Sequence, residues 1–272
     1  MTEANRFSPA RCGSVSCSSV FAAPQGVALV FVRARALVAM TGNVVERASR
    51  VGHGFVPRLE QSVAVSAEIR EVSDGLWLWR VEYPDWRPGL GWGPFVNSTC
   101  VASAGEVALL DPIAPPKDAT ATWERLDAAS PTLAVVLKPD HVRDVDLFVQ
   151  RYGARAFGPS LFWRNNIPET ELVPIEPGSE LPGGLVALYD GRGRGETPVW
   201  VPDQRALVFA DALTAPEGEL LVWATPWHDE RTVPALRALL DLPFEHVIVS
   251  HGEPVHDRVA YERALELTPW SG

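Results

Sequence analysis

Cysteine is scarce in this 272-residue chain, which has only Cys12, Cys17 and Cys100 at uneven spacing. Three cysteines are too few for a disulfide framework, and no second close pair follows the first two. The sequence therefore indicates neither a disulfide-stapled scaffold nor a cysteine-based zinc site. Because reduced thiols are the rule in the cytoplasm, we expect the protein there.

Long apolar runs are lacking as well. The best of them, residues 26–32, is far shorter than the roughly 20 apolar residues that a membrane helix needs. Arg33 and Arg35 follow this run, whereas a secretory signal places its basic residues first. We therefore expect no membrane partner.

Positive charge is the third shortage. Lys and Arg number 24 against 34 Asp and Glu, which gives a formal net charge of −10, and lysine occurs only at positions 117 and 138. An acidic surface repels phosphate backbones, and no basic cluster with interleaved aromatics offsets it. We therefore expect no nucleic-acid partner and favour a small-molecule substrate.

The chain does have enough apolar residues, 46%, to bury a sizeable core. Residues 1–62 mix Ser, Gly, Ala and Arg with little periodicity, which predicts a poorly ordered N-terminal extension. Residues 63–272 contain the periodic segments and are predicted to form one domain.

Within that domain, a β-rich block leads into a β-α-β block, and the order then repeats. Asp74-Gly75 between two alternating runs is typical of a hairpin turn. The repeat predicts two related halves, with helices outside two sheets. The predicted strands are 68–72, 76–81, 95–101, 107–111, 133–137, 154–157, 185–189, 198–201, 207–210 and 247–250, and the predicted helices are 142–152, 233–240 and 258–267.

Three of the apolar strands run into polar groups. Residues 133–137 lead through Lys138 to Asp140-His141, residues 206–210 lead to Asp211, and residues 246–250 lead to His251. Carboxylate oxygen and imidazole nitrogen suit one divalent zinc, iron or manganese ion. Each residue also has an ordinary structural explanation, as a helix cap or a turn residue.

The pattern resembles the metallo-β-lactamase fold superfamily over roughly Val72 to Leu267. The resemblance implies an α+β fold, a four-layer αββα sandwich of two pseudo-related halves. It depends on four pieces in the family's order: Asn97-Ser98-Thr99-Cys100-Val101 with Leu109-Leu110-Asp111-Pro112, Ala134-Val135-Val136-Leu137 before Asp140-His141, Leu207-Val208-Phe209-Ala210-Asp211-Ala212-Leu213, and Val249-Ser250-His251-Gly252-Glu253.

The family's signature, a His-x-His-x-Asp-His motif with a later His, a bridging Asp and a C-terminal His, holds two metal ions. With Asp140-His141 aligned to the end of the motif, Val136 and Lys138 replace its first two histidines, and Glu196 replaces the later one. The ligands of the second ion all remain, so the resemblance implies a single metal held by Asp140, His141, Asp211 and His251. A different register would make Asp144 the acid of the motif in place of Asp140.

These residues suggest a hydrolase that acts on an ester, thioester, lactone or amide of a small metabolite. One divalent ion, zinc before iron or manganese, would activate water. Asp140 and Asp211 are the candidates to orient that water, and Lys138 is the candidate to polarise a substrate carbonyl. Four protein ligands would nevertheless crowd a tetrahedral zinc ion.

Other roles stay open for this chain. Glu196 is expected either to add an oxygen ligand or to pair with Lys138. The alternative function is that of a degenerate member of the fold, without metal or catalysis, that has a binding or structural role.

Overall fold

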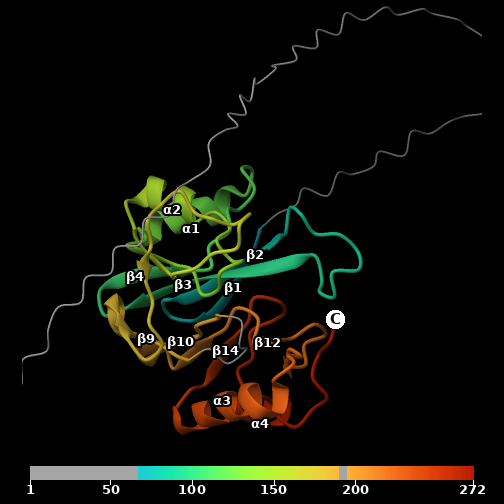
Figure 1. The fold of residues 1–272 in the computed structure, drawn as a ribbon. Helices are drawn as coiled ribbons and strands as arrows, with labels where there is room; N and C mark the ends of the chain where they lie inside the picture. Colours follow the sequence, from blue (N-terminus) through green and yellow to red (C-terminus); the bar gives the residue numbers. More distant parts are fainter. Residues whose placement is uncertain (1–66, 190–194) are drawn as a thin grey trace, which may run out of the picture. The chain divides into compact units, whose positions relative to one another are not determined.

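The computed structural model describes residues 67–189 and 195–272, which fall within one compact unit, residues 60–272 (Figure 1). The extension predicted for residues 1–62 lies outside the described residues. Among the helices of the described ranges, none is long and apolar enough to cross a membrane.

The first sheet has seven strands in chain order, antiparallel from β1 to β4 and parallel from β4 to β7. The hairpin predicted around Asp74-Gly75 is present, with a positive φ of 78° at Gly75, and β3 and β4 form a second hairpin. The strands are β1 (Glu68–Ser73), β2 (Leu76–Glu82), β3 (Phe95–Ser103), β4 (Glu106–Leu110), β5 (Leu133–Val135), β6 (Arg155–Gly158) and β7 (Val173–Pro174).

The second sheet has five strands in the order β14-β11-β10-β9-β8, and its β11 and β14 are parallel. In the sequence, β12 and β13 come between β11 and β14, and they pair with each other as a separate two-stranded antiparallel sheet. The strands are β8 (Glu180–Leu181), β9 (Leu185–Ala187), β10 (Val199–Val201), β11 (Ala206–Val208), β12 (Leu213–Thr214), β13 (Leu221–Val222) and β14 (His246–Ile248).

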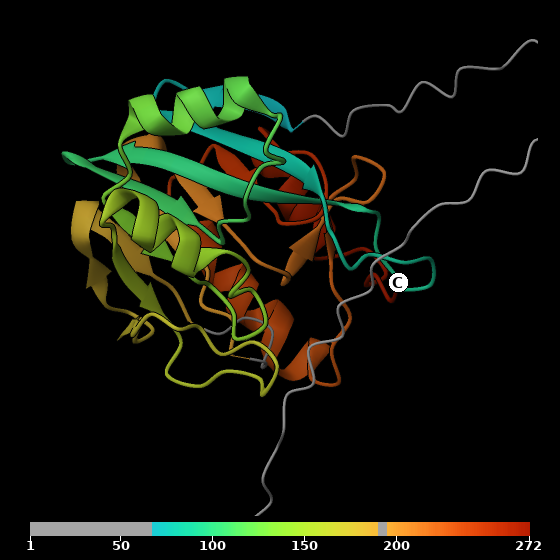
Figure 2. The ribbon, with the colours of Figure 1, turned by 90° about the horizontal axis from the view of Figure 1, so that it is seen from above.

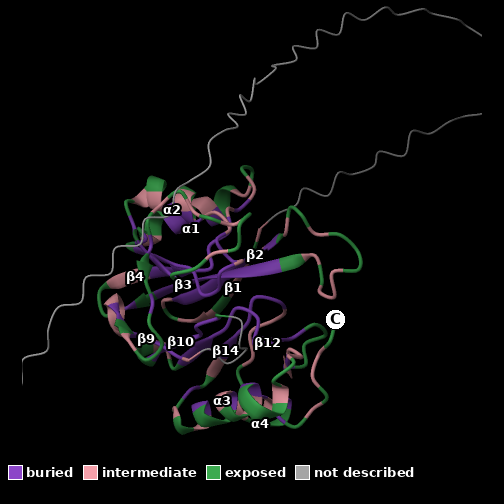
Figure 3. Cartoon of the chain, in the orientation of Figure 1, coloured by how far each residue is buried: buried purple, intermediate pink, exposed green. Residues whose placement is uncertain are grey.

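The two sheets bury one apolar layer between them, which includes Leu110 and Val135 from the first sheet and Val208 and Ile248 from the second. Helices cover the outer faces of both sheets, so the layers are α, β, β and α (Figures 1 and 2). The predicted four-layer α+β sandwich is confirmed. Burial follows the same layers, because the strands are largely buried while the helices expose their outer sides (Figure 3).

Each helix pair is held to its sheet by aromatic and aliphatic side chains. Leu126 of α1 (Thr120–Ala129) and Phe148 of α2 (Val145–Tyr152) pack with Trp79 on the first sheet. Leu236 of α3 (Val233–Ala238) and Tyr261 of α4 (Arg258–Ala264) pack on the second sheet. Short helical turns complete the fold at Pro182–Gly184, Pro202–Gln204, His228–Thr232 and Leu239–Asp241.

The structure shifts several of the sequence-based boundaries, two of them next to the site, and adds a helix. Strand 133–137 ends as a strand at Val135, and helix 142–152 begins at Val145 because residues 138–144 turn into the site. Helix α1 was not predicted. Only Thr122 and Leu126 in it are buried, so its apolar stripe is too thin to stand out in the sequence.

Candidate metal centre

The register of β11 and β14 places two candidate ligands side by side. These parallel strands pair Val208 with Ile248, and Asp211 and His251 each follow three residues later. Because the carboxyl ends of parallel strands lie at one edge of a sheet, both side chains leave the sheet at the same place. Their atoms Oδ1 and Nε2 lie 3.3 Å apart.

The turn after His251 depends on Gly252. Its φ is +129°, and a Cβ there would lie 2.3 Å from the carbonyl oxygen of Ala215. This backbone approach leaves no room for a side chain. The turn therefore fixes the direction in which His251 leaves its strand.

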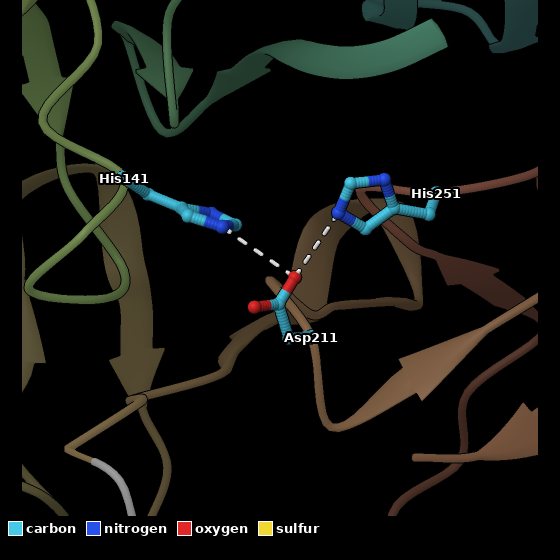
Figure 4. Close-up of side chains that lie close together, drawn as sticks. All are labelled: His141, Asp211 and His251. Carbon is cyan, nitrogen blue, oxygen red and sulfur yellow. Dashed lines mark ion pairs between the residues drawn. The ribbon is translucent and has the colours of Figure 1, made fainter. Parts of the chain in front are cut away.

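His141 completes a group of three from the other sheet. It follows β5, and its Nε2 lies 3.4 Å from Oδ1 of Asp211, the oxygen that His251 also faces (Figure 4). The three side chains are buried, and their candidate ligand atoms all lie within 4.8 Å of one another. The structure thus brings together His141, Asp211 and His251 of the predicted ligand set.

The spacing of these atoms suits a metal ion. Bonds from zinc to imidazole nitrogen or carboxylate oxygen are about 2.0–2.2 Å long, so two ligand atoms on a tetrahedral ion are about 3.3–3.6 Å apart. The distances from Oδ1 of Asp211 to Nε2 of His251 and of His141, 3.3 and 3.4 Å, fall in that range. Three protein ligands also leave a fourth position open, as catalytic sites require.

Asp111 orients His141 from behind. Its Oδ2 accepts a hydrogen bond of 2.8 Å from Nδ1 of His141, and its Oδ1 accepts one of 2.7 Å from the N–H of Leu137. The Nδ1 contact turns Nε2 toward Asp211, which is how carboxylates commonly prepare a histidine to bind metal. Asp111 was not among the predicted site residues, although it ends an apolar strand just as Asp211 does, because an acid in that place is usually a turn residue.

Arg143 holds the segments around this group. Its guanidinium donates 2.8 Å hydrogen bonds to the carbonyl oxygens of Asn97 and Asp111, and a further one to Oγ of Ser250. The residue has a left-handed backbone, with a φ of 47°. It therefore joins β3, the end of β4 and the end of β14, a role that no sequence motif indicates.

The buried charges of the group depend on one another. Burial by itself would lower the pKa of His141, but the carboxylates of Asp211 and Asp111 outweigh it and raise the pKa to about 9. Burial would raise the pKa of Asp211, yet His141, His251 and Lys138 hold that pKa well below its usual range. For His251, burial lowers the pKa and the carboxylate of Asp211 only partly opposes this.

Lys138 lies on the opposite side of Asp211. Its ammonium nitrogen is 2.5 Å from Oδ2 of Asp211 and 2.6 Å from Oδ2 of Asp140, and the residue is 4% exposed. A buried ammonium needs such partners, because an unpaired charge in the interior is very costly. Lys138 therefore has two carboxylate partners in place of the predicted Glu196.

Asp140 lines the same cavity but does not join the three clustered ligands. Its Oδ2 is held by Lys138, while its Oδ1 is buried and has no hydrogen-bond partner among the described residues. Asp144, the alternative acid, is at the start of α2, where its Oδ2 accepts a 2.7 Å hydrogen bond from the N–H of Ala114. The cavity side chain is thus that of Asp140.

Glu196 is fully buried and supports the backbone that carries Asp211. Its two oxygens accept 2.9 Å hydrogen bonds from the N–H groups of Ala210 and Asp211. The carboxylate therefore positions the candidate ligand through the main chain.

The group opens into a cavity of about 330 Å³. One wall is aromatic: the ring of Trp92 lies 4.5 Å from that of His251, and Trp223 lies 5.8 Å from it on another side. The rest of the lining is mostly charged and polar, with Leu90 and Val96 as its aliphatic residues. Besides those two rings, the lining residues are Tyr83, Leu90, Val96, Lys138, Asp140, His141, Arg143, Asn166, Asp211 and His251.

Comparison with known proteins gives structural relatives alone. No protein-family model matches the chain, and no curated protein matches it by sequence. Among solved structures, the DIM-1 metallo-β-lactamase is similar with a TM-score of 0.55 and 14% identity over 74% of this chain and 96% of that chain. A metallo-β-lactamase from Pontibacter korlensis is similar with a TM-score of 0.54 and 18% identity over 75% of this chain and all of that one.

A third similar structure is FIM-1 from Pseudomonas aeruginosa, a metallo-β-lactamase in a mono-zinc form, with a TM-score of 0.53 and 16% identity over 74% of this chain and 96% of that chain. Together with the four layers and the sheet order, these matches define the architecture. The chain has the metallo-β-lactamase fold, with the candidate site at the strand ends of both sheets.

Proposed function

We propose that this protein is a hydrolase that uses one divalent metal ion, held by His141, Asp211 and His251. The observation that carries the proposal is the convergence of both Nε2 atoms on Oδ1 of Asp211 at 3.3 and 3.4 Å, inside a cavity. Zinc is the first expectation, and iron or manganese would suit the same donors. The substrate is an ester, thioester, lactone or amide of a small metabolite.

An ion bound there would supply Lewis-acid chemistry and lower the pKa of water toward neutrality. The residues around it prepare the reaction. Asp111 holds the ring of His141 in place, and the unpartnered Oδ1 of Asp140 is available to accept a proton from the attacking water. Lys138, whose ammonium has two of its three N–H groups on carboxylates, can donate the third to a developing oxyanion.

The aromatic wall has a separate part in this proposal. Trp92 and Trp223 flank His251 and limit the access of water to it. A drier site strengthens each electrostatic interaction with the substrate. The cavity, at about 330 Å³, is at the small end of ligand sites, which favours a small metabolite.

The test is metal content by elemental mass spectrometry, on protein purified without chelator, beside Asp211→Ala. About one equivalent of zinc, iron or manganese that is lost in the variant would support the proposal. A panel of esters, thioesters, lactones and amides then defines the activity. Absence of metal from both proteins, even after incubation with zinc and manganese, would overturn the proposal.

The second candidate is a binding protein of this fold without catalysis. The contacts of Lys138 favour it, since they neutralise charge on Asp140 and Asp211 without any metal. If this candidate is correct, the protein should contain no metal and should hydrolyse no substrate of the panel.

A further inference from the structure

Lysine is a rare choice in this chain, and one of its two lysines is buried in the cavity. Lys117 is exposed, Lys138 is 4% exposed, and every other basic side chain is arginine. Lysine carries a compact point charge on a flexible stem, whereas arginine carries a broad planar fork. The position therefore holds the one protein cation whose size approaches that of a metal ion.

The carboxylate of Asp211 divides its two oxygens between two partners. Oδ1 faces His141 and His251, which we name the histidine side, and Oδ2 faces the ammonium of Lys138, which we name the lysine side. Asp140 is the second carboxylate on the lysine side, at 2.6 Å from the same nitrogen. The lysine side thus has two acidic ligands around one cation, which is the arrangement around a bound metal.

The charges in direct contact with Lys138 disfavour a further ion on the lysine side. Asp140, Asp211 and Lys138 together carry a single negative charge, and a divalent ion on the histidine side makes the sum a single positive charge. A second divalent ion would then meet net repulsion in a buried, weakly screened site. Glu196 keeps its negative charge, but its oxygens accept the N–H groups of Ala210 and Asp211, so it supports the main chain there, and the acids that contact the ammonium are Asp140 and Asp211.

We propose that Lys138 is a resident cation that occupies the place of another metal ion, on the lysine side, and restricts the site to the one ion on the histidine side. The inference rests on the proposed function for the metal on the histidine side. It adds that the ammonium repels that metal and so weakens its affinity. A lysine that only supported the fold would have the opposite effect, since its removal would loosen the ligands.

The first experiment is a zinc titration of the full chain by calorimetry, with bound metal counted by elemental mass spectrometry. The wild type is expected to stop at one equivalent in excess zinc. Lys138→Met keeps the length of the side chain without its charge, and it is expected to bind zinc about tenfold tighter or more, or to take up more than one equivalent. Either gain supports the inference. Lys117→Met is the matched control and is expected to match the wild type.

The outcomes separate the two proposals. A folded Lys138→Met variant that binds zinc no more tightly and in no greater amount than the wild type overturns the inference and leaves the proposed function standing. A wild type without zinc, beside a variant that binds it, overturns the proposed function and also the inference, because Lys138 would then exclude every ion and would not restrict the site to one. Zinc binding by neither protein overturns both.

A second measurement covers a variant that fails to fold. With only two lysines, wild-type protein labelled with ¹³C,¹⁵N-lysine gives two sets of side-chain signals. One equivalent of zinc is expected to shift the Nζ and Cε signals of Lys138 and to leave those of Lys117 in place. Unchanged Lys138 signals at full zinc occupancy would overturn the inference, because an ammonium beside a metal ligand must sense the ion.

Discussion

The histidine side and the lysine side of the cavity share the carboxylate of Asp211 but differ in the groups that face it. On the histidine side, two imidazoles face Oδ1 of Asp211 and offer donor atoms to an ion from solution. On the lysine side, the ammonium of Lys138 is already in place between Oδ2 of Asp211 and Asp140. Under the proposed function, Asp211 would serve an exchangeable cation through Oδ1 and a covalently attached one through Oδ2.

Loss of the shared carboxylate is expected to have the largest effect on this comparison. Asp211→Asn removes the charge that both sides use, so metal affinity should fall by more than the roughly 10–100-fold typical of a residue that only orients a ligand. Calorimetric zinc titration measures it, and Asp118→Asn, at an exposed position, is the control. Unchanged zinc affinity would show that the metal is held elsewhere.

Loss of one imidazole is expected to affect the histidine side alone. His141→Ala and His251→Ala each remove a ligand, so the rise in melting temperature that zinc gives the wild type should shrink or vanish. The control is His256→Ala, an exposed histidine whose Nδ1 lies 2.9 Å from that of His246. If zinc stabilises all three variants equally, the histidine side is not the metal site.

Asp111→Asn tests orientation without removing a ligand. Asp111 uses one oxygen for Nδ1 of His141 and the other for the N–H of Leu137, whereas an asparagine side chain has only one acceptor oxygen. The imidazole therefore loses part of its support. We expect zinc affinity to fall by about 10–100-fold while the stoichiometry stays the same. Affinity equal to that of the wild type in calorimetry would limit Asp111 to a role in folding.

Glu196→Gln should have the smallest effect on metal affinity. A glutamine side chain has one acceptor oxygen, so one of the two N–H groups that Glu196 serves loses its partner. An unsatisfied buried donor costs about 1–3 kcal/mol, so the denaturation midpoint should fall. Glu171→Gln, at an exposed position, should leave it unchanged. A larger loss of zinc affinity than Asp111→Asn gives would instead make Glu196 a ligand.

Much of the architecture was predictable because its signals are local. Alternating runs around Asp74-Gly75 and apolar strands ending in polar residues are typical of hairpins and strand ends, and both appear in the structure. Asp211 and His251 lie side by side because each stands three residues after a paired residue of its strand, Val208 and Ile248. Helix α1 was not predictable from hydrophobic periodicity, because only two of its residues are buried.

The finer contacts of the site could not be predicted, since they depend on side-chain direction after the strands end. Nothing in the order Lys138-Pro139-Asp140-His141 says that Asp140 pairs with Lys138 while His141 turns to Asp111. Arg143 adopts a left-handed backbone conformation, which nothing in the local sequence predicts. Whether Asp140 or Asp144 enters the cavity became apparent only in three dimensions.

The contact between Lys138 and Asp211 also joins the segment after β5 to the segment after β11, and so ties one sheet to the other. Both partners of this ion pair are side chains of the protein itself, whereas a metal ion must be bound from the cell. The two halves can therefore close on each other before any ion arrives, and starvation for metal would empty the site without opening the sandwich. Of the three positive charges that Lys138 and a divalent ion would together bring to the site, one is therefore supplied by an amino acid.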